Sequence, residues 1–187
     1  ALNFSGIDTV VYEASDGTYT HQATVTITVN NQNDPPALDL DGVAGGGINY
    51  VTAFTEGSGA IALTGGALIT DLDSTDMQSA TIALNPAKAG DLLSIQGTAS
   101  NLPAGITAVE GGSYILLNGS PLAPKASWEQ ALDLIRFNNE LVGPDVTQRS
   151  VAFIVHDESG DVSLAAFTTI DILVDDDPPL LDLDADG

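Results

Sequence analysis

The acidic residues of the chain are gathered into short groups, and their oxygen atoms suit the binding of a hard cation. The 187 residues include 26 Asp and Glu but only 4 Lys and Arg, which gives a formal net charge of -22. Ca²⁺ accepts roughly 6 to 8 oxygen ligands at flexible geometry, whereas Mg²⁺ prefers a stricter octahedron. The groups are residues 31–34, Asp39 with Asp41, Glu56, Asp71 with Asp73 and Asp76, Asp157 with Glu158 and Asp161, residues 175–177, and Asp182 with Asp184 and Asp186.

The clustering, rather than any one pair, indicates calcium. A single Asp-x-Asp is more often a solvated turn than a metal site. Asp175, Asp176 and Asp177 stand side by side, and like charges at such short range repel unless a cation lies among them. Pro178 and Pro179 follow at once and restrict the chain there.

Several other functions lack the residues that they need. Nucleic acid requires a basic stripe, and anionic membrane is disfavoured for the same reason, because the only basic residues are Lys88, Lys125, Arg136 and Arg149. The absence of Cys excludes disulfides, thiolate zinc sites and cysteine nucleophiles. We find neither an apolar run of about 18 residues nor a signal-peptide pattern, so no membrane insertion is expected.

Catalysis is not expected either, although paired carboxylates can hydrolyse glycosides. A general acid needs apolar surroundings that raise its pKa, and these acids lie in turns rich in Gly, Asp and Pro. The sequence has no Gly-x-Ser-x-Gly nucleophile motif and no phosphate loop. His21 and His156 are far apart, and each is expected on a surface or an edge strand. We therefore predict that the chain is not an enzyme.

An internal repeat sets the predicted domain organisation. Residues 34–41, DPPALDLD, recur at residues 177–184 as DPPLLDLD. Each copy follows an alternating strand, with Ala23, Val25, Ile27 and Val29 on one face before the first, and Ile170, Ile172 and Val174 before the second. We interpret residues 1–36 as the C-terminal part of one repeat and its linker, 37–179 as a complete repeat, and 180–187 as the start of the next.

Short β-like runs separated by turn signals predict an all-β fold, a Greek-key β-sandwich, for the complete repeat. The runs are residues 50–55, 67–70, 79–84, 92–95, 105–109, 113–117 and 151–155. One helical turn is predicted over residues 127–135. Ser127 and Gln130 would form a capping box there, and Trp128, Leu132 and Ile135 share one helical face.

The linkers resemble those of bacterial cadherin-like repeats, whose acidic linkers bind calcium between consecutive domains. Residues 31–36, NQNDPP, are similar to the family's Asp-x-Asn-Asp-x-x-Pro linker, with Asn31 in place of the first Asp. Residues 174–179 keep the acidic core but have Val174 at the first position. The resemblance implies a cadherin or immunoglobulin-like sandwich in a tandem array.

The resemblance also implies a set of calcium ligands within each domain. Glu56 matches the family's early Glu, Asp71 and Asp73 match its Asp-x-Asp, and Asp157 matches the Asp before the turn of the penultimate strand. No convincing match to the mid-domain Asp-x-Glu is found. At the first junction the implied ligands are Asn33, Asp34, Asp71, Asp73 and Asp157, with Asn31 as a weaker one. At the second junction they are Glu56, Asp175, Asp176 and Asp177.

The complete repeat is longer than a typical cadherin domain. Its segments 71–74, 79–82 and 128–137 are similar to those of the enlarged repeats found in giant bacterial adhesins. The predicted function is therefore that of a calcium-binding repeat, extracellular or at the cell surface, which stiffens a long protein together with neighbouring repeats.

Two alternatives remain open. One is a carbohydrate-binding module that takes a cell-surface glycan, with Trp128, Tyr50 and Tyr114 as candidate contacts, although we expect all three aromatic residues in the core. The other is a homophilic adhesion domain that takes a protein ligand.

Overall fold

The computed structural model describes residues 4–42 and 46–175, and the chain divides into two units, Ala1–Asp34 and Pro35–Gly187. The division falls beside the boundary predicted near Pro36. The second predicted boundary, near Pro179, and the predicted ligands Asp176 and Asp177 lie outside the described residues. The tandem organisation stays a prediction.

The first unit is an antiparallel hairpin of β1 (Gly6–Ser15) and β2 (Thr20–Val29). Its turn is closed by the Asp16 carboxylate, whose Oδ1 accepts hydrogen bonds of 2.8 Å from the N–H groups of Thr18 and Tyr19. Val10 pairs with Val25. Because side chains alternate along a strand, Ile27 and Val29 share the face of Val25, as the sequence pattern predicts. All of these side chains are exposed in the unit taken by itself.

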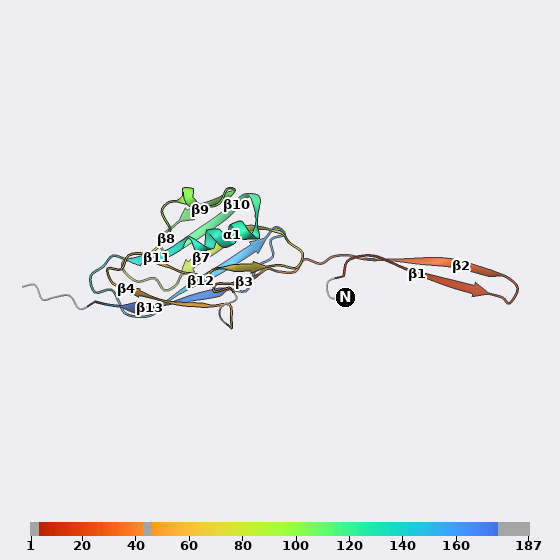
Figure 1. The fold of residues 1–187 in the computed structure, drawn as a ribbon, viewed down its shortest axis with the longest axis horizontal. Coiled ribbons are helices and arrows are strands. Elements are labelled where there is room, and N and C mark those ends of the chain that lie inside the picture. The colour runs from red at the N-terminus through yellow and green to blue at the C-terminus, as the bar shows by residue number, and fades with distance from the viewer. Residues whose placement is uncertain (1–3, 43–45, 176–187) are drawn as a thin grey trace, which may run out of the picture. The chain divides into compact units, whose positions relative to one another are not determined.

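The second unit is built on a six-stranded sheet (Figure 1). In spatial order its strands are β4 (Tyr50–Thr55), β13 (Ala166–Leu173), β12 (Arg149–Asp157), β7 (Asp76–Leu84), β10 (Tyr114–Pro124) and β9 (Ile106–Glu110). β4 and β13 are parallel, and the other neighbours are antiparallel. The predicted β runs each overlap a strand of the unit.

Two smaller sheets accompany the large one. One has the order β5 (Ile61–Ala62), β11 (Ile135–Asn139), β8 (Asp91–Ile95), and the other pairs β3 (Ala37–Asp39) with β6 (Leu68–Thr70). A short 3₁₀ helix spans Ala99–Asn101. The rings of Phe54 on β4 and Phe137 on β11 meet edge to face with centroids 5.4 Å apart, and both are fully buried. The large sheet and the β11 sheet therefore enclose a common core, which confirms the all-β sandwich.

Burial alternates along β12. Val151, Phe153 and Val155 are fully buried, while the residues between them are half-buried. Successive side chains of a strand point to opposite faces of the sheet, so β12 has one core-facing side although Ala152 and Ile154 on its other side are also apolar. On β10, the side chain of Tyr114 lies on the face of the sheet that points away from the core. It is 41% exposed because Ile115 takes the core-facing position, so the expectation that Tyr114 lies in the core is wrong.

The helix α1 (Lys125–Asp133) begins before the predicted start, and the predicted capping box is wrong. β10 runs directly into it, so Pro124 is the N-cap, no side chain caps the helix, and Ser127 lies inside it. Trp128 and Leu132 are fully buried as predicted, whereas Ile135 is buried but belongs to β11. The Trp128 Nε1–H donates a 3.1 Å hydrogen bond to the carbonyl of Met77.

The remaining aromatic candidate, Tyr50, is half-buried and packs against the core, as expected. Within the described residues, no helix has the length and apolar character needed to span a bilayer.

Candidate metal centre

The parallel pairing of β4 and β13 brings two predicted ligands to the same end of the large sheet. Thr55 pairs with Leu173 at the end of both strands. The N–H of Glu56, the next residue after β4, donates a 2.9 Å hydrogen bond to the carbonyl of Leu173. Asp175 lies two residues after Leu173 along the chain. Glu56 and Asp175 therefore lie at one edge of the sheet because their strands run in the same direction.

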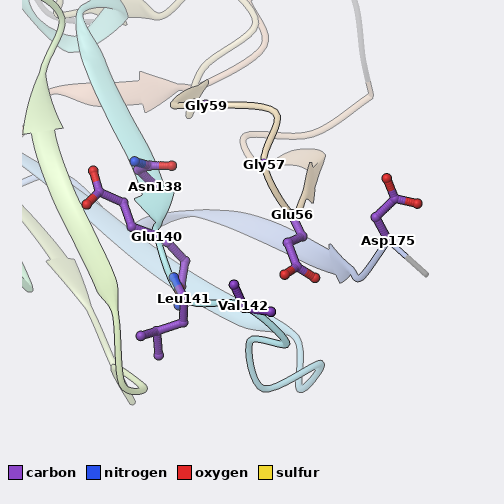
Figure 2. Close-up of a pocket in the computed structure, with 9 residues that line it drawn as sticks. Glu56, Gly57, Gly59, Asn138, Glu140, Leu141, Val142 and Asp175 are labelled. Carbon is purple, nitrogen blue, oxygen red and sulfur yellow. The ribbon is translucent and has the colours of Figure 1, made fainter. Parts of the chain in front are cut away.

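A third segment, from the end of β11, completes a pocket at this edge. Glu56, Asn138, Glu140 and Asp175 line an open groove of about 480 Å³, together with Leu141 and Val142 (Figure 2). Figure 2 shows the Glu140 carboxylate pointing away from Glu56. Glu56 is half-buried, while Glu140 and Asp175 are exposed. We call this groove the acidic pocket.

Glu56 is the best-fixed carboxylate of the acidic pocket. Its Oε1 accepts a 2.8 Å hydrogen bond from the N–H of Gly143, 87 residues along the chain. This bond orients the side chain and joins the end of β4 to the loop after β11. A carboxylate held in this way keeps lone pairs on its oxygens for a further partner.

The donors of the acidic pocket fit a hard cation. Carboxylate and amide oxygens line it, and no Lys, Arg or His is among the lining residues. Such a donor set suits Ca²⁺ rather than a transition metal. However, across residues 4–42 and 46–175 no three Asp, Glu, His or Cys side chains gather closely enough to hold a metal ion. The described carboxylates line the pocket without converging on one point.

The other predicted ligands of the second unit lie at its opposite end. Asp157 pairs with Met77 at the end of β12, and β12 is antiparallel to β13, so Asp157 lies away from the Asp175 end. Ala37 pairs with Thr70, the residue before Asp71. The chain therefore enters this unit, through Pro36, beside the turn that carries Asp71 and Asp73.

The turn at Asp71 contains an unsatisfied carboxylate oxygen. Asp71 Oδ1 accepts hydrogen bonds from the N–H groups of Asp73 and Ser74, at 3.1 and 2.8 Å. Asp71 Oδ2 is buried and has no hydrogen-bond partner within the described residues. The Lys125 ammonium bonds the main-chain carbonyls of Asp71 and Ser74, at 3.2 and 2.9 Å. Buried polar atoms in proteins are normally paired, so an orphaned carboxylate oxygen fits a missing cation.

Asp157 is completely buried and belongs to a tight turn. Its Oδ1 accepts hydrogen bonds from the N–H groups of Ser159 and Asp161, at 2.9 and 2.8 Å. Asn31, Asn33 and Asp34 belong to the first unit. Binding of calcium by any of the predicted ligands stays a prediction.

Sequence reasoning missed Asn138 and Glu140 as residues of the acidic pocket. Asn138 is the fourth residue of β11, and Glu140 follows the end of that strand. They reach the pocket through the pairing of β11 with β5 and β8, which no local sequence pattern gives.

The Asp39–Asp41 pair was singled out as an acidic group but not as a site. The N–H of Asp41 donates to Asp39 Oδ1 at 3.1 Å, and Asp41 Oδ1 is buried with no partner within the described residues. Burial, and then the hydrogen bond and charge of Asp39, raise the pKa of Asp41. The neighbouring Asp39 therefore disfavours the ionisation of Asp41.

Comparisons with known proteins leave the family open. No family model matches the sequence, and no curated protein matches it. Among solved structures, the fold is similar to a cohesin module of a family 33 glycoside hydrolase from Clostridium perfringens, with a TM-score of 0.41 and 13% identity over 76% of this chain and 98% of that one. This similarity is too low to support a conclusion about function. Membership of the cadherin-like repeats stays a prediction.

Proposed function

We propose that this chain is a calcium-binding structural repeat of an extracellular surface protein, and that ions bound at the ends of the sandwich stiffen its junctions with neighbouring repeats. The observation that carries the proposal is the acidic pocket, in which Glu56, Glu140 and Asp175 line one groove with no basic side chain among the lining residues. The unsatisfied Asp71 Oδ2 at the opposite end supports it independently.

At the acidic pocket, Glu56 and Asp175 are the proposed ligands among the described residues, with Asn138 as an additional oxygen donor. Glu56 is already held by Gly143, so it offers a fixed carboxylate at the end of β4. Asp175 lies on the chain that leaves β13, and by sequence Asp176 and Asp177 add two more carboxylates. Bound Ca²⁺ supplies the positive charge that offsets their repulsion and ties the departing chain to the end of the sheet.

At the opposite end, Asp71, Asp73 and Asp157 are the proposed ligands of the second unit. Asp71 Oδ2 gains the partner that it lacks, and Asp157 is held in place by its two main-chain hydrogen bonds. Asn31, Asn33 and Asp34 are proposed as ligands on sequence alone.

Thermal unfolding in EDTA and in millimolar Ca²⁺ tests the proposal. An ion that binds only the folded state stabilises it by about 2.7 kcal/mol at a concentration 100 times its Kd, so the melting temperature should rise with calcium. Glu56→Gln should remove part of this rise, whereas Glu13→Gln in the exposed hairpin is the charge-matched control and should keep all of it. An unchanged melting temperature for the wild type would rule the calcium proposal out.

Polysaccharide binding is a second candidate, and one observation favours it. Tyr114, Ala83, Ala152 and Phe167 occupy one row across β10, β7, β12 and β13, and both aromatic side chains are 41% exposed. At about 4.8 Å per strand the two rings are roughly 14 Å apart, with small residues between them. Trp128 is not available for this role because it is fully buried.

A glycan array with the wild type and Tyr114→Ala tests this candidate. Binding that the variant loses would favour the carbohydrate-binding alternative over a plain spacer. Absence of binding to every glycan would remove the alternative.

A further inference from the structure

The wall of the acidic pocket is fixed to the protein core through the side chain of Asn139. Asn139 is the last residue of β11 and is 3% exposed. Its Nδ2 donates hydrogen bonds of 2.9 Å to the carbonyl of Ala89 and to Asp91 Oδ1. Its Oδ1 accepts a 2.9 Å hydrogen bond from the N–H of Leu141, which lines the pocket. Both polar atoms of the Asn139 amide are therefore hydrogen-bonded, Nδ2 to residues 89 and 91 and Oδ1 to the pocket loop.

The partner of Asn139 is itself held by a buried ion pair. Arg149 Nε lies 2.7 Å from Asp91 Oδ2, and both side chains have no exposed surface. Asp91 Oδ2 also accepts a 2.8 Å hydrogen bond from the N–H of Lys88, and Arg149 Nη2 donates a 2.9 Å bond to the carbonyl of Asp145. Asn139 is thus attached to a group of buried charges whose geometry is set by several bonds.

A glycine allows this close approach. Gly90 has φ +78, and a Cβ atom built there would lie 2.5 Å from both Asn139 Oδ1 and Leu141 Cγ. A side chain at position 90 would displace Asn139 or Leu141, and the left-handed backbone also favours glycine. At the far end of the loop, the N–H of Gly143 bonds Glu56 Oε1. The segment from Asn139 to Gly143 is therefore fastened at both of its ends.

We infer that Asn139 is a positioning residue of the acidic pocket, which fixes the 140–143 loop, and through it Glu56, before any ion binds. This inference rests on the proposed function. A loop that is ordered in advance does not lose conformational entropy when the ligand arrives, so the affinity of the pocket is higher than that of the same oxygens on a free loop.

Hydrogen exchange in EDTA tests the ordering directly and without metal. The amide protons of Leu141 and Gly143 should be protected in the wild type, because both are hydrogen-bonded inside the structure. Free exchange of these two protons in EDTA, with protection only after Ca²⁺ is added, would overturn the inference.

A calcium titration followed by the NMR signal of the Gly143 amide then measures the consequence. In Asn139→Ala the half-saturation concentration at this amide should rise about five- to tenfold. Ile115→Val on β10 is the control, since it removes a buried methyl group outside the pocket and should leave the half-saturation concentration unchanged.

The outcomes separate the two hypotheses. If the Gly143 signal of the wild type does not change with Ca²⁺, the proposed function is contradicted. The hydrogen exchange in EDTA then still decides the role of Asn139. If the wild type and Asn139→Ala reach half-saturation at the same Ca²⁺ concentration, only the inference about Asn139 is contradicted. If Asn139→Ala does not fold, the exchange measured on the wild type decides it.

Discussion

Arg149 and Asp91, 58 residues apart in the sequence, form an ion pair with both side chains completely buried and 2.7 Å between Arg149 Nε and Asp91 Oδ2. The chain has only four basic residues for its 26 acids, and one of them is enclosed here. A second, Lys125, binds main-chain carbonyls of the turn at Asp71. A third, Arg136, donates hydrogen bonds to the main-chain carbonyls of Asp133 and Ile135. Three of the four basic groups therefore make hydrogen bonds that hold the fold together.

Replacing Arg149 with Met should destabilise the protein by about 3–5 kcal/mol, because Asp91 would remain buried without its counter-charge. Lys88→Met is the control. It removes the partly exposed pair of Lys88 with Asp145, whose side chains are 35% and 44% exposed, and should cost less than about 1 kcal/mol. Urea denaturation of the three proteins measures both values, and equal losses would contradict the role given to burial.

Trp128→Phe should cost about 2–4 kcal/mol, because it leaves a cavity under α1 and removes the hydrogen bond to the Met77 carbonyl. Tyr114→Phe removes a polar group from an exposed ring and should change the free energy of unfolding by less than about 0.5 kcal/mol. Guanidinium denaturation monitored by circular dichroism compares the two. A Trp128→Phe protein as stable as the wild type would contradict the contribution of this ring to stability.

Asp41→Asn should stabilise the metal-free protein at neutral pH. The pKa of Asp41 is raised from 3.8, so the folded state binds its proton more tightly than the unfolded state does. The stability that this provides is fully present below pH 3.8 and is lost as the pH rises through the raised pKa. Melting temperatures in EDTA between pH 3.5 and 7 should therefore fall less with rising pH in Asp41→Asn than in the wild type. Asp8→Asn in the hairpin is the control, and matching curves for Asp41→Asn and the wild type would contradict the prediction.

Asp71→Asn should have opposite effects in the absence and in the presence of calcium. In EDTA the substitution removes the negative charge of a carboxylate whose Oδ2 is buried without a partner within the described residues, and it should raise the melting temperature. In millimolar Ca²⁺ it removes a proposed ligand and should reduce the calcium-induced rise. Differential scanning calorimetry under both conditions makes the comparison, and a change of the same sign in both would argue against calcium at this turn.

Sequence patterns were sufficient for the strands because alternation is a local property. Along β13 the sequence alternates in this way, and Ile170 and Ile172 are buried whereas Asp171 between them is exposed. The start of α1 could not be read in the same way. Ser127 and Gln130 have the spacing of a capping box, but β10 continues to Pro124 and leaves them inside the helix.

The acidic pocket could be predicted only in part, because it depends on long-range pairing. Glu56 and Asp175 were assigned to one junction on resemblance alone, whereas Glu140 reaches the pocket through the position of β11, which no local pattern gives. The role of Asn139 was equally out of reach. Its partner Asp91 lies 48 residues away, and its contact with Leu141 requires the glycine at position 90.

The position of β13 determines how the second unit would respond to tension. β13 is hydrogen-bonded on both sides, to β4 and to β12, and the chain leaves it at the Leu173 end. A pull on Asp175 along the axis of β13 would load the hydrogen bonds of both ladders in shear and all at once, instead of opening them one after another. β13 therefore cannot be drawn out of the sheet without breaking its hydrogen bonds to β4 and to β12 together.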